Sequence, residues 1–198
     1  MRSHLRPAVV LLVLATLVTG GLYPAVVTLV ARVVFPWQAG GSLLATGDLA
    51  VGSALVGQPF AGDGWLVGRP SATSARPYDA SASSGSNLGP TNPVLDSLVR
   101  ARVAAARTRE GLATDAMVPV DLVTASASGL DPHLSPAAAA LQLPRIARVR
   151  GLTPDSVRAL LAAATEPRWL GLAGEPRVNV LRANLLLAGA PVHRISTP

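Results

Sequence analysis

The hydrophobic and polar pattern begins with a long apolar run near the N-terminus. Residues 8–31 carry no charged side chain, and as a helix this run would extend about 36 Å. The hydrocarbon core of a bilayer is about 30 Å thick. The pattern therefore predicts a transmembrane helix over residues 8–35, preceded by a short tail of residues 1–7. A cleaved secretory signal is the alternative, but the run is longer than a usual signal core and lacks an A-x-A cleavage pattern.

The charges that flank this run predict its orientation. Arg2 and Arg6 precede the span, whereas only Arg32 follows it closely. Because positive charge is retained in the cytoplasm, we expect a cytoplasmic N-terminus and an extracytoplasmic domain of residues 36–198. The protein would then be a single-pass protein of the cell (inner) membrane, in contact with membrane lipid.

Small residues and a proline recur along the span at a spacing of about four. Such residues let a second helix backbone approach closely, which favours helix packing in lipid. A partner helix in the membrane is one interpretation; the alternative is that these residue types are simply common in transmembrane helices. The candidate packing residues are Thr16, Gly20, Gly21, Pro24, Ala25 and Thr28.

After the span, apolar residues at helical spacing follow three polar residues that each precede a proline. Asn92-Pro93 predicts a helix to about residue 109, Ser135-Pro136 one toward residue 150, and Thr153-Pro154 one through residue 164. We expect Pro144 to break or kink the second of these helices.

The remaining segments predict short strands and loops. Strands are expected at 53–56, 65–67, 117–124 and 177–181, with apolar residues 185–187 continuing as a final helix. A Gly-rich loop is expected at 38–46 and a long polar loop at 68–92. Because strands and helices interleave without a regular βαβ period, the predicted fold class is α+β, with one domain behind a single N-terminal transmembrane helix.

Composition excludes several classes of chemistry. The 198 residues are 49% hydrophobic and 14% charged, which is too apolar for one soluble domain alone. Cysteine is absent, which excludes disulfides, thiolate zinc sites and cysteine nucleophiles. All 17 basic residues are arginine, so a P-loop lysine and a lysine Schiff base are excluded too. Scattered arginines and few aromatic residues argue against a nucleic-acid partner.

One stretch carries the residue types of a serine hydrolase: Asp121, Ser126, Ser128, Asp131 and His133. Two observations argue against a hydrolase: no G-x-S-x-G motif occurs, and the last two residues flank Pro132 at a spacing unsuited to a triad. His133 and His193 are the only histidines outside the N-terminal tail, and no pair of acidic residues flanks either of them at metal-ligand spacing, so no metal site is expected. Neither glycine-rich nucleotide motif occurs.

The most distinctive polar segment is the loop of residues 83–93. Its carbonyls and the side-chain oxygens of Ser86, Asn87 and Asn92, with Asp131 and His133 as further candidates, could contact an ion or a partner protein. The alternative is that these residues only form turns.

Several blocks of sequence follow one another in a recognisable order. They include Tyr23-Pro24, Gly57-Gln58-Pro59-Phe60, Gly68-Arg69-Pro70-Ser71-Ala72, Gly85-Ser86-Asn87-Leu88-Gly89-Pro90-Thr91-Asn92-Pro93, Ser128-Gly129-Leu130-Asp131-Pro132-His133 and Gly174-Glu175-Pro176-Arg177-Val178-Asn179. In these blocks the chain resembles the KdpC family, the C subunits of bacterial Kdp potassium-transporting ATPases. The resemblance covers the chain from the membrane span almost to its end, and departs from the usual pattern at Ser84 and Ala127, where glycine is common.

This resemblance implies a non-catalytic subunit of an ATP-driven potassium uptake complex. The implied partners are a channel-like potassium-binding subunit, a P-type ATPase catalytic subunit and a small single-helix subunit. The chain alone would bind no cofactor, while the complex uses ATP and K⁺. The family also suggests Gln58 as a helper of ATP binding; because the predicted topology places Gln58 outside the cell, a role in assembly and in shaping the potassium entrance is preferred.

Overall fold

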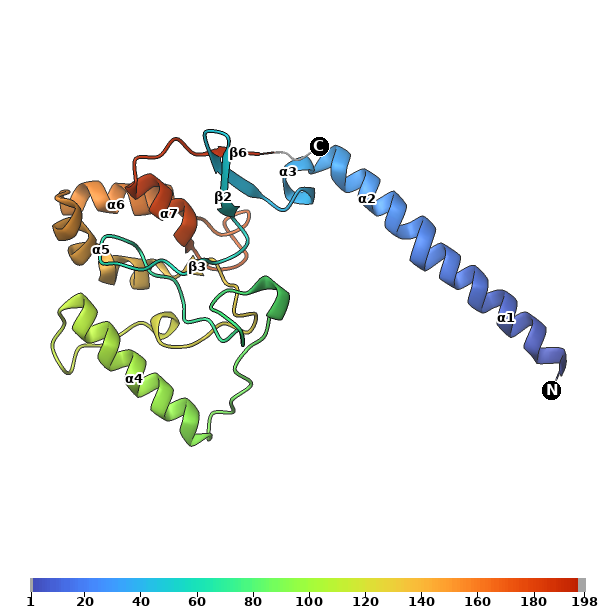
Figure 1. Ribbon diagram of the computed structural model, residues 1–198, viewed down its shortest axis with the longest axis horizontal. Coiled ribbons are helices and arrows are strands. Elements are labelled where there is room, and N and C mark those ends of the chain that lie inside the picture. Colours follow the sequence, from blue (N-terminus) through green and yellow to red (C-terminus); the bar gives the residue numbers. More distant parts are fainter. Residues whose placement is uncertain (1, 196–198) are drawn as a thin grey trace. The chain divides into compact units, whose positions relative to one another are not determined.

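The structure is a computed structural model that describes residues 2–195 (Figure 1). The chain divides into two compact units. We call residues 2–43 with 194–195 the anchor unit, and residues 44–193 the domain unit. The described chain contains helices and two small sheets, which confirms the predicted α+β class.

The anchor unit consists mainly of one continuous helical segment, α1 (Arg2–Leu17), η1 (Val18–Leu22) and α2 (Tyr23–Val34). The helix His4–Val34 is long and apolar enough to cross a membrane, and its apolar window has no buried residues. It extends beyond the uncharged run on both sides, and it confirms the apolar helix predicted from the sequence.

A π-helical turn, η1, interrupts the regular hydrogen bonding of this helix just before Pro24. Proline lacks an N–H and its ring crowds the carbonyl four residues earlier, here that of Gly20. The Tyr23 N–H reaches back five residues to the Val18 carbonyl, and this wider turn makes room for the ring. The helix therefore passes Pro24 without ending.

The segment after the membrane helix is fixed by aromatic and backbone contacts within the anchor unit. Trp37 lies in α3 (Pro36–Ala39) and its Nε1–H donates to the Leu43 carbonyl at 2.9 Å. The Ile195 N–H donates to the same carbonyl at 3.1 Å, and the Arg194 guanidinium lies 4.3 Å from the centre of the Trp37 ring. The predicted loop at 38–46 is thus partly wrong, because α3 and β1 (Leu43–Thr46) occupy most of it.

Two three-stranded sheets are present in the described part of the chain. One has the order β2 (Leu49–Ser53), β1, β6 (His193–Arg194), and the other the order β3 (His133–Leu134), β5 (Arg177–Asn179), β4 (Thr165–Glu166). In the second sheet both pairings are antiparallel, with His133 opposite Asn179 and Thr165 opposite Val178.

The core of the domain unit lies where three helices meet this second sheet. Helices α5 (Pro136–Arg150), α6 (Pro154–Ala163) and α7 (Val180–Leu187) group together in Figure 1, and α4 (Pro93–Glu110) runs beside α5. Apolar side chains from α5, α6, α7 and β5, together with Leu66 from the segment of residues 65–67, form one cluster that includes Ile146, Val157 and Val178. Burial of such side chains is the main favourable term in folding.

The three predicted helix starts are confirmed. The side chains of Asn92, Ser135 and Thr153 each accept a hydrogen bond from an N–H in the first turn of α4, α5 and α6, respectively. Gly111 and Gly151 end α4 and α5 with φ of 66° and 65°, the left-handed conformation that glycine adopts without a side-chain penalty.

The expected break at Pro144 is wrong, because α5 continues through it to Arg150. Pro144 and Ala140, whose carbonyl loses its partner, are both exposed, so water can satisfy that carbonyl. On the opposite face Leu143, Ile146 and Ala147 are buried. Their burial outweighs the cost of the proline, about 3 kcal/mol.

Segment 65–67 has no partner strand, contrary to the sequence prediction. Two buried side-chain amides take the place of that strand. The Asn184 amide donates to the Leu66 carbonyl and accepts from the Leu66 N–H, both at 2.8 Å. The Gln142 amide makes the same pair of bonds with Val67, at 2.9 and 3.0 Å.

The strands predicted at 53–56 and 117–124 are also not formed. Strand β2 ends at Ser53, and residues 117–124 contain a single 3-10 turn, η3 (Val120–Leu122). The alternating valines of the second segment indicated a strand, but Val120 is exposed and only Val123 reaches the interior.

A buried arginine joins α5 to α4 and to the segment before Leu66. The Arg145 Nε lies 2.9 and 3.0 Å from the two carboxylate oxygens of Glu110, at the C-terminal end of α4. Its other nitrogens donate to the Gln142 side chain at 2.9 Å and to the Trp65 carbonyl at 3.1 Å. This ion pair is the most deeply buried one among the described residues.

Candidate functional site

Five charged or titratable side chains form a row in which basic and acidic groups alternate. We call Arg69, Asp131, His133, Glu166 and Arg177 the ionic row. Arg69 lies 3.1 Å from Asp131, and Arg177 donates to Glu166 at 2.8 and 2.9 Å. His133 lies between the two carboxylates, 3.6 Å from Asp131 and 3.5 Å from Glu166.

Strand pairing produces this row. His133 begins β3, Glu166 ends β4, and Arg177 begins β5, the strand between them. Glu166 pairs directly with Arg177 across the sheet. Asp131 lies just before β3, and its carboxylate accepts a hydrogen bond from the His133 N–H at 3.0 Å.

The Asp131 carboxylate accepts hydrogen bonds from two residues of the row, Arg69 and His133. Burial by itself raises the pKa of Asp131, but the His133 ring, the His133 N–H and the Arg69 guanidinium together outweigh it. The pKa of Asp131 therefore lies below its ordinary value, and this carboxylate is negatively charged at neutral pH.

The His133 ring has few hydrogen-bond partners. Its side chain is largely buried, and Nε2 has no hydrogen-bond partner among residues 2–195. Both carboxylates stand slightly beyond hydrogen-bond distance. His133 Nε2 is therefore a buried ring nitrogen without a hydrogen-bond partner in the described chain.

Tyr78 fixes the backbone that carries Arg69. Its hydroxyl donates to the Arg69 carbonyl at 2.5 Å, and its N–H donates to the Ser71 hydroxyl at 2.9 Å. Its ring leaves no room for a side chain at Gly57, where a Cβ would overlap the ring carbons. Burial first, and then the charge of Asp131, raise the pKa of Tyr78 to about 12, although Arg69 opposes this.

Two open hollows flank the ionic row and share Arg69 and Asp131. One, of about 430 Å³, is also lined by His133, Glu175 and Arg177. The other, of about 530 Å³, is lined by the loop of residues 126–132. Polar and charged groups of both signs line the first hollow, which suits recognition of a polar protein segment or a hydrated ion more than an apolar ligand.

The hydrolase interpretation gains no geometric support. In the described chain, no hydrogen bond links His133 to Ser126 or Ser128. The Ser128 hydroxyl accepts from the Leu130 N–H at 3.1 Å, and Ser126 is buried. Asp121 accepts from the Ser135 N–H at 2.7 Å, so its carboxylate stabilises the start of α5.

The candidate contact residues of loop 83–93 fall into two groups. Asp131 and His133 lie together in the ionic row, whereas the Asn92 side chain caps α4 by accepting from the Val94 N–H at 2.9 Å. Ser86 and Asn87 are exposed, and within the described chain neither bonds to the ionic row. Asn87 has a φ of 52°, as expected for a turn.

Loop 83–93 packs on the loop of residues 126–129. The Ser83 hydroxyl donates to the Ser128 carbonyl at 3.0 Å. A Cβ at Gly85 would lie 2.9 Å from the Ala127 carbonyl oxygen. The backbone of loop 83–93 is therefore held beside the second hollow.

Gln58, suggested by family resemblance as an ATP-binding helper, is engaged with β2. Its Nε2 donates to the Val51 carbonyl at 2.9 Å. The side chain fills the space above Gly52, where a Cβ would overlap Nε2. In this structure Gln58 fixes the end of the β1–β2 hairpin.

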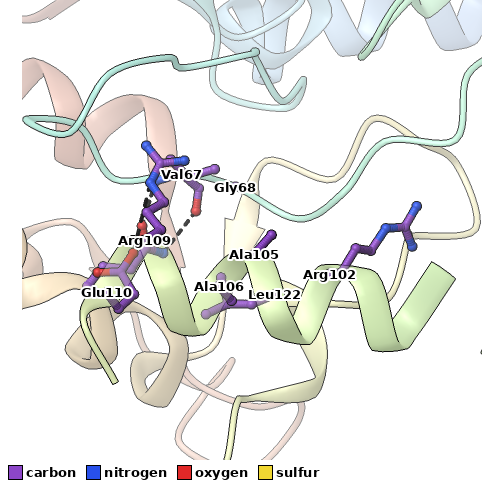
Figure 2. A pocket seen from close by; sticks show the side chains of 9 residues that line it. Val67, Gly68, Arg102, Ala105, Ala106, Arg109, Glu110 and Leu122 are labelled. Carbon is purple, nitrogen blue, oxygen red and sulfur yellow. Dashed lines mark hydrogen bonds and ion pairs between the residues drawn. The ribbon is translucent and has the colours of Figure 1, made fainter. Parts of the chain in front are cut away.

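A third, smaller cavity, of about 170 Å³, lies between α4 and residues 67–68 (Figure 2). Ala105, Ala106 and Leu122 line it together with Arg102 and Arg109. Burial and the nearby Arg145 lower the pKa of Arg109, and Arg109 Nη2 donates to the Gly62 carbonyl at 2.9 Å. Arg102 and Arg109, which line this cavity, therefore donate hydrogen bonds to backbone carbonyls around it.

The candidate packing residues of the membrane helix lie around η1. A spacing of four drifts by about 40° per step on a regular helix, and the wider turn at η1 reduces that drift between Thr16 and Pro24. The Thr16 hydroxyl donates to the Leu12 carbonyl at 2.8 Å. Gly20 and Gly21 leave open space where a side chain would stand, so a second backbone can approach there.

Sequence reasoning did not identify Tyr78, Glu166 or Arg177 as members of one site. Glu166 and Arg177 meet only through the register of β4 and β5, which residue order does not reveal. Tyr78 has a φ of 60° that no local signal predicts. Arg69 was noted only as part of one of the sequence blocks that resemble the KdpC family.

Comparison with known proteins identifies close relatives over nearly the whole chain. The family model described as "K+-transporting ATPase, c chain" (KdpC) matches residues 5–189. Three proteins named "Potassium-transporting ATPase KdpC subunit" are similar to this chain. That of Polaromonas naphthalenivorans is 56% identical over 94% of this chain and 95% of its own. That of Burkholderia cenocepacia HI2424 is 55% identical over 96% and 98%, and that of Sorangium cellulosum 56% over 96% and 100%.

Proposed function

The chain belongs to the KdpC family of potassium-transporting ATPase subunits, and from this premise we propose that it is a non-catalytic, membrane-anchored subunit that stabilises the assembled transporter. Membership implies a role in potassium transport. The observation that carries the proposal is that the match includes both the apolar helix and the domain unit. The relatives therefore share the anchor as well as the domain.

The proposed partners are the channel-like potassium-binding subunit, the P-type catalytic subunit and the small single-helix subunit. Gly20 and Gly21 offer a close approach to a partner helix within the membrane. The hollows beside the ionic row offer charged groups of both signs to a partner outside it. Neither surface needs a catalytic group of its own.

We further propose that the domain unit lies outside the cell, where it shapes the entrance for potassium. Arg6 before the span and the flanking arginine count support this orientation. Exposed Ser86 and Asn87 would then be available to a partner or to potassium at that entrance. The alternative role, assistance of ATP binding through Gln58, needs the opposite orientation, and the bond from Gln58 to Val51 does not favour it.

The orientation can be tested because the chain has no cysteine. We would introduce Met117→Cys, at an exposed position of the domain unit, and, in a separate chain, His4→Cys, at the exposed start of the helix. A membrane-impermeant maleimide should label the Met117→Cys chain in intact cells and the His4→Cys chain only after permeabilisation. The reverse pattern would refute the extracytoplasmic domain and restore the ATP-helper role.

Assembly can be tested in bacteria that lack their own copy of this subunit. The chain should restore growth at limiting potassium and co-purify with the other transporter subunits, while the purified chain alone should hydrolyse no ATP. ATP hydrolysis by the chain alone, or a full-length chain that restores growth without co-purifying, would contradict the proposal.

The proposed role at the potassium entrance can be tested separately by a substitution in loop 83–93. Asn87→Asp adds a negative charge at an exposed turn, and the potassium affinity of the complex should change if this loop faces the ion. The control is Ser156→Asn, on the exposed side of α6. An affinity equal to that of the control would remove the loop from the entrance.

A further inference from the structure

The hairpin between β4 and β5 exposes three large apolar side chains at its end. We call Trp169, Leu170 and Leu172 the apolar tip; their exposed fractions are 71%, 74% and 85%. Scattered apolar residues on a protein surface are ordinary, but a contiguous exposed group marks an interaction site. No other part of the candidate site uses these residues.

The apolar tip is held outward by its own backbone. The Trp169 N–H donates to the Ala173 carbonyl at 2.9 Å, and the Ala173 N–H donates back at 3.1 Å. Leu170 has a φ of 51° and Gly171 a φ of 74°, so the turn places a leucine in a conformation that side chains disfavour. The backbone of the hairpin therefore fixes the positions of these exposed side chains.

Ion pairs at the base of the hairpin leave it without net charge. Arg168 pairs with Glu175 at 2.6 Å, and Arg177 pairs with Glu166 at 2.8 Å. An apolar end on a neutral base does not require a charged partner. A tryptophan beside leucines is the composition that enters the interface of a bilayer.

The size of the patch and the length of the tether favour lipid over protein as its partner. Stable protein interfaces bury about 800 Å² on each side, far more than three side chains supply. Only nine residues, 35–43, separate the end of α2 from the domain unit, a reach of about 30 Å at most. This short tether raises the effective concentration of the bilayer at the domain unit.

We propose that the apolar tip inserts into the headgroup region of the bilayer that the anchor helix crosses, so that a lipid surface is its ligand. Because the hairpin is neutral, insertion does not depend on anionic lipid or on ionic strength. The inference goes beyond the proposed function, and it holds for either orientation of the chain, since lipid is present on both sides.

The test uses the full chain in vesicles of phosphatidylcholine, with a single nitroxide label on Leu172→Cys. The matched control carries the label on Ala162→Cys, at an exposed position of α6. The label at position 172 should collide with lipid-soluble oxygen more than with a water-soluble nickel chelate, and the label at position 162 should do the opposite. Added phosphatidylglycerol or salt should change neither result.

A second variant separates insertion from other causes of burial. Adding Trp169→Ala to the Leu172→Cys chain should lower the ratio of inserted to free tip about tenfold. Equal collision profiles for the labels at positions 172 and 162 in vesicles would overturn the proposal. Protection of the label at position 172 only in the complete transporter would overturn it as well, because the tip would then contact a protein subunit.

Discussion

The buried pair of Arg145 and Glu110 provides the sharpest test of how the domain unit is held together. Their side chains are 1% and 3% exposed. Arg145→Met would leave the Glu110 carboxylate buried without its cation, and would also remove the donors to Gln142 and to the Trp65 carbonyl. Breaking a buried ion pair on one side costs about 3–5 kcal/mol. For a chain of this size the melting temperature should fall by about 10 °C.

The assay is denaturant unfolding of the full chain in detergent micelles, followed by tryptophan fluorescence and near-UV circular dichroism. Trp65 is the useful reporter, because Arg145 binds its carbonyl and the Arg150 guanidinium lies 4.3 Å from its ring centre. Far-UV signals are less suitable, since the membrane helix contributes to them throughout.

The matched control is an exposed ion pair on the helix that carries Glu110. Asp96 and Arg100 are 2.8 Å apart in α4, but their side chains are 61% and 78% exposed. Asp96→Asn should leave the unfolding midpoint unchanged, because exposed pairs contribute little. Replacing both buried partners, with Glu110→Leu and Arg145→Met, should cost less than Arg145→Met alone. If Arg145→Met behaved like the Asp96 control, the reasoning from burial would be refuted.

Four further predictions concern other parts of the chain. Asn184→Leu should destabilise the chain by about 2–4 kcal/mol in the same unfolding assay, because both polar backbone groups of Leu66 would stay buried without partners; an unchanged midpoint would contradict this. The pKa of Asp131 is lowered in the folded chain, so its contribution to stability is present above the ordinary pKa of 3.8 and is lost as the pH falls through the lower folded pKa. In the Asp131→Asn chain the free energy of unfolding should therefore fall less steeply as the pH is lowered in this acidic range. Since the pKa of Tyr78 is raised from 10.0 to about 12, its contribution is complete below pH 10 and is lost as the pH rises through about 12; Tyr78→Phe should remove the latest phase of an ultraviolet titration at alkaline pH. Gly20→Leu should reduce co-purification of the transporter subunits several-fold without altering insertion of the helix, whereas Leu14→Val, at an exposed position of the same helix, should not.

Features encoded by a few neighbouring residues could be predicted from the sequence. The starts of α4, α5 and α6 depend on a capping side chain followed by proline, so Asn92, Ser135 and Thr153 were identified without knowledge of the fold. The apolar helix was equally clear, because a run of uncharged residues has few alternative structures. The α+β class followed from the same local signals.

Features that depend on distant partners could not be predicted. Segment 65–67 has the composition of a strand, yet its hydrogen bonds come from Gln142 and Asn184. Pro144 stays within α5 because the opposite face of the helix is buried. The ionic row requires the register of β5 between β3 and β4, and so its members were recognised only in part.

The dependence of residues 65–67 on later side chains has a consequence for synthesis of the protein. Leu66 is 118 residues away from Asn184, and Val67 is 75 residues away from Gln142. A ribosome adds about 5–20 residues per second, so about 6 to 24 s pass between the synthesis of Leu66 and that of its hydrogen-bond partner Asn184. During that interval the nascent chain exposes an extended apolar stretch to chaperones and proteases, while the membrane helix has already been made. A chain released before residue 184 would remain in this open state.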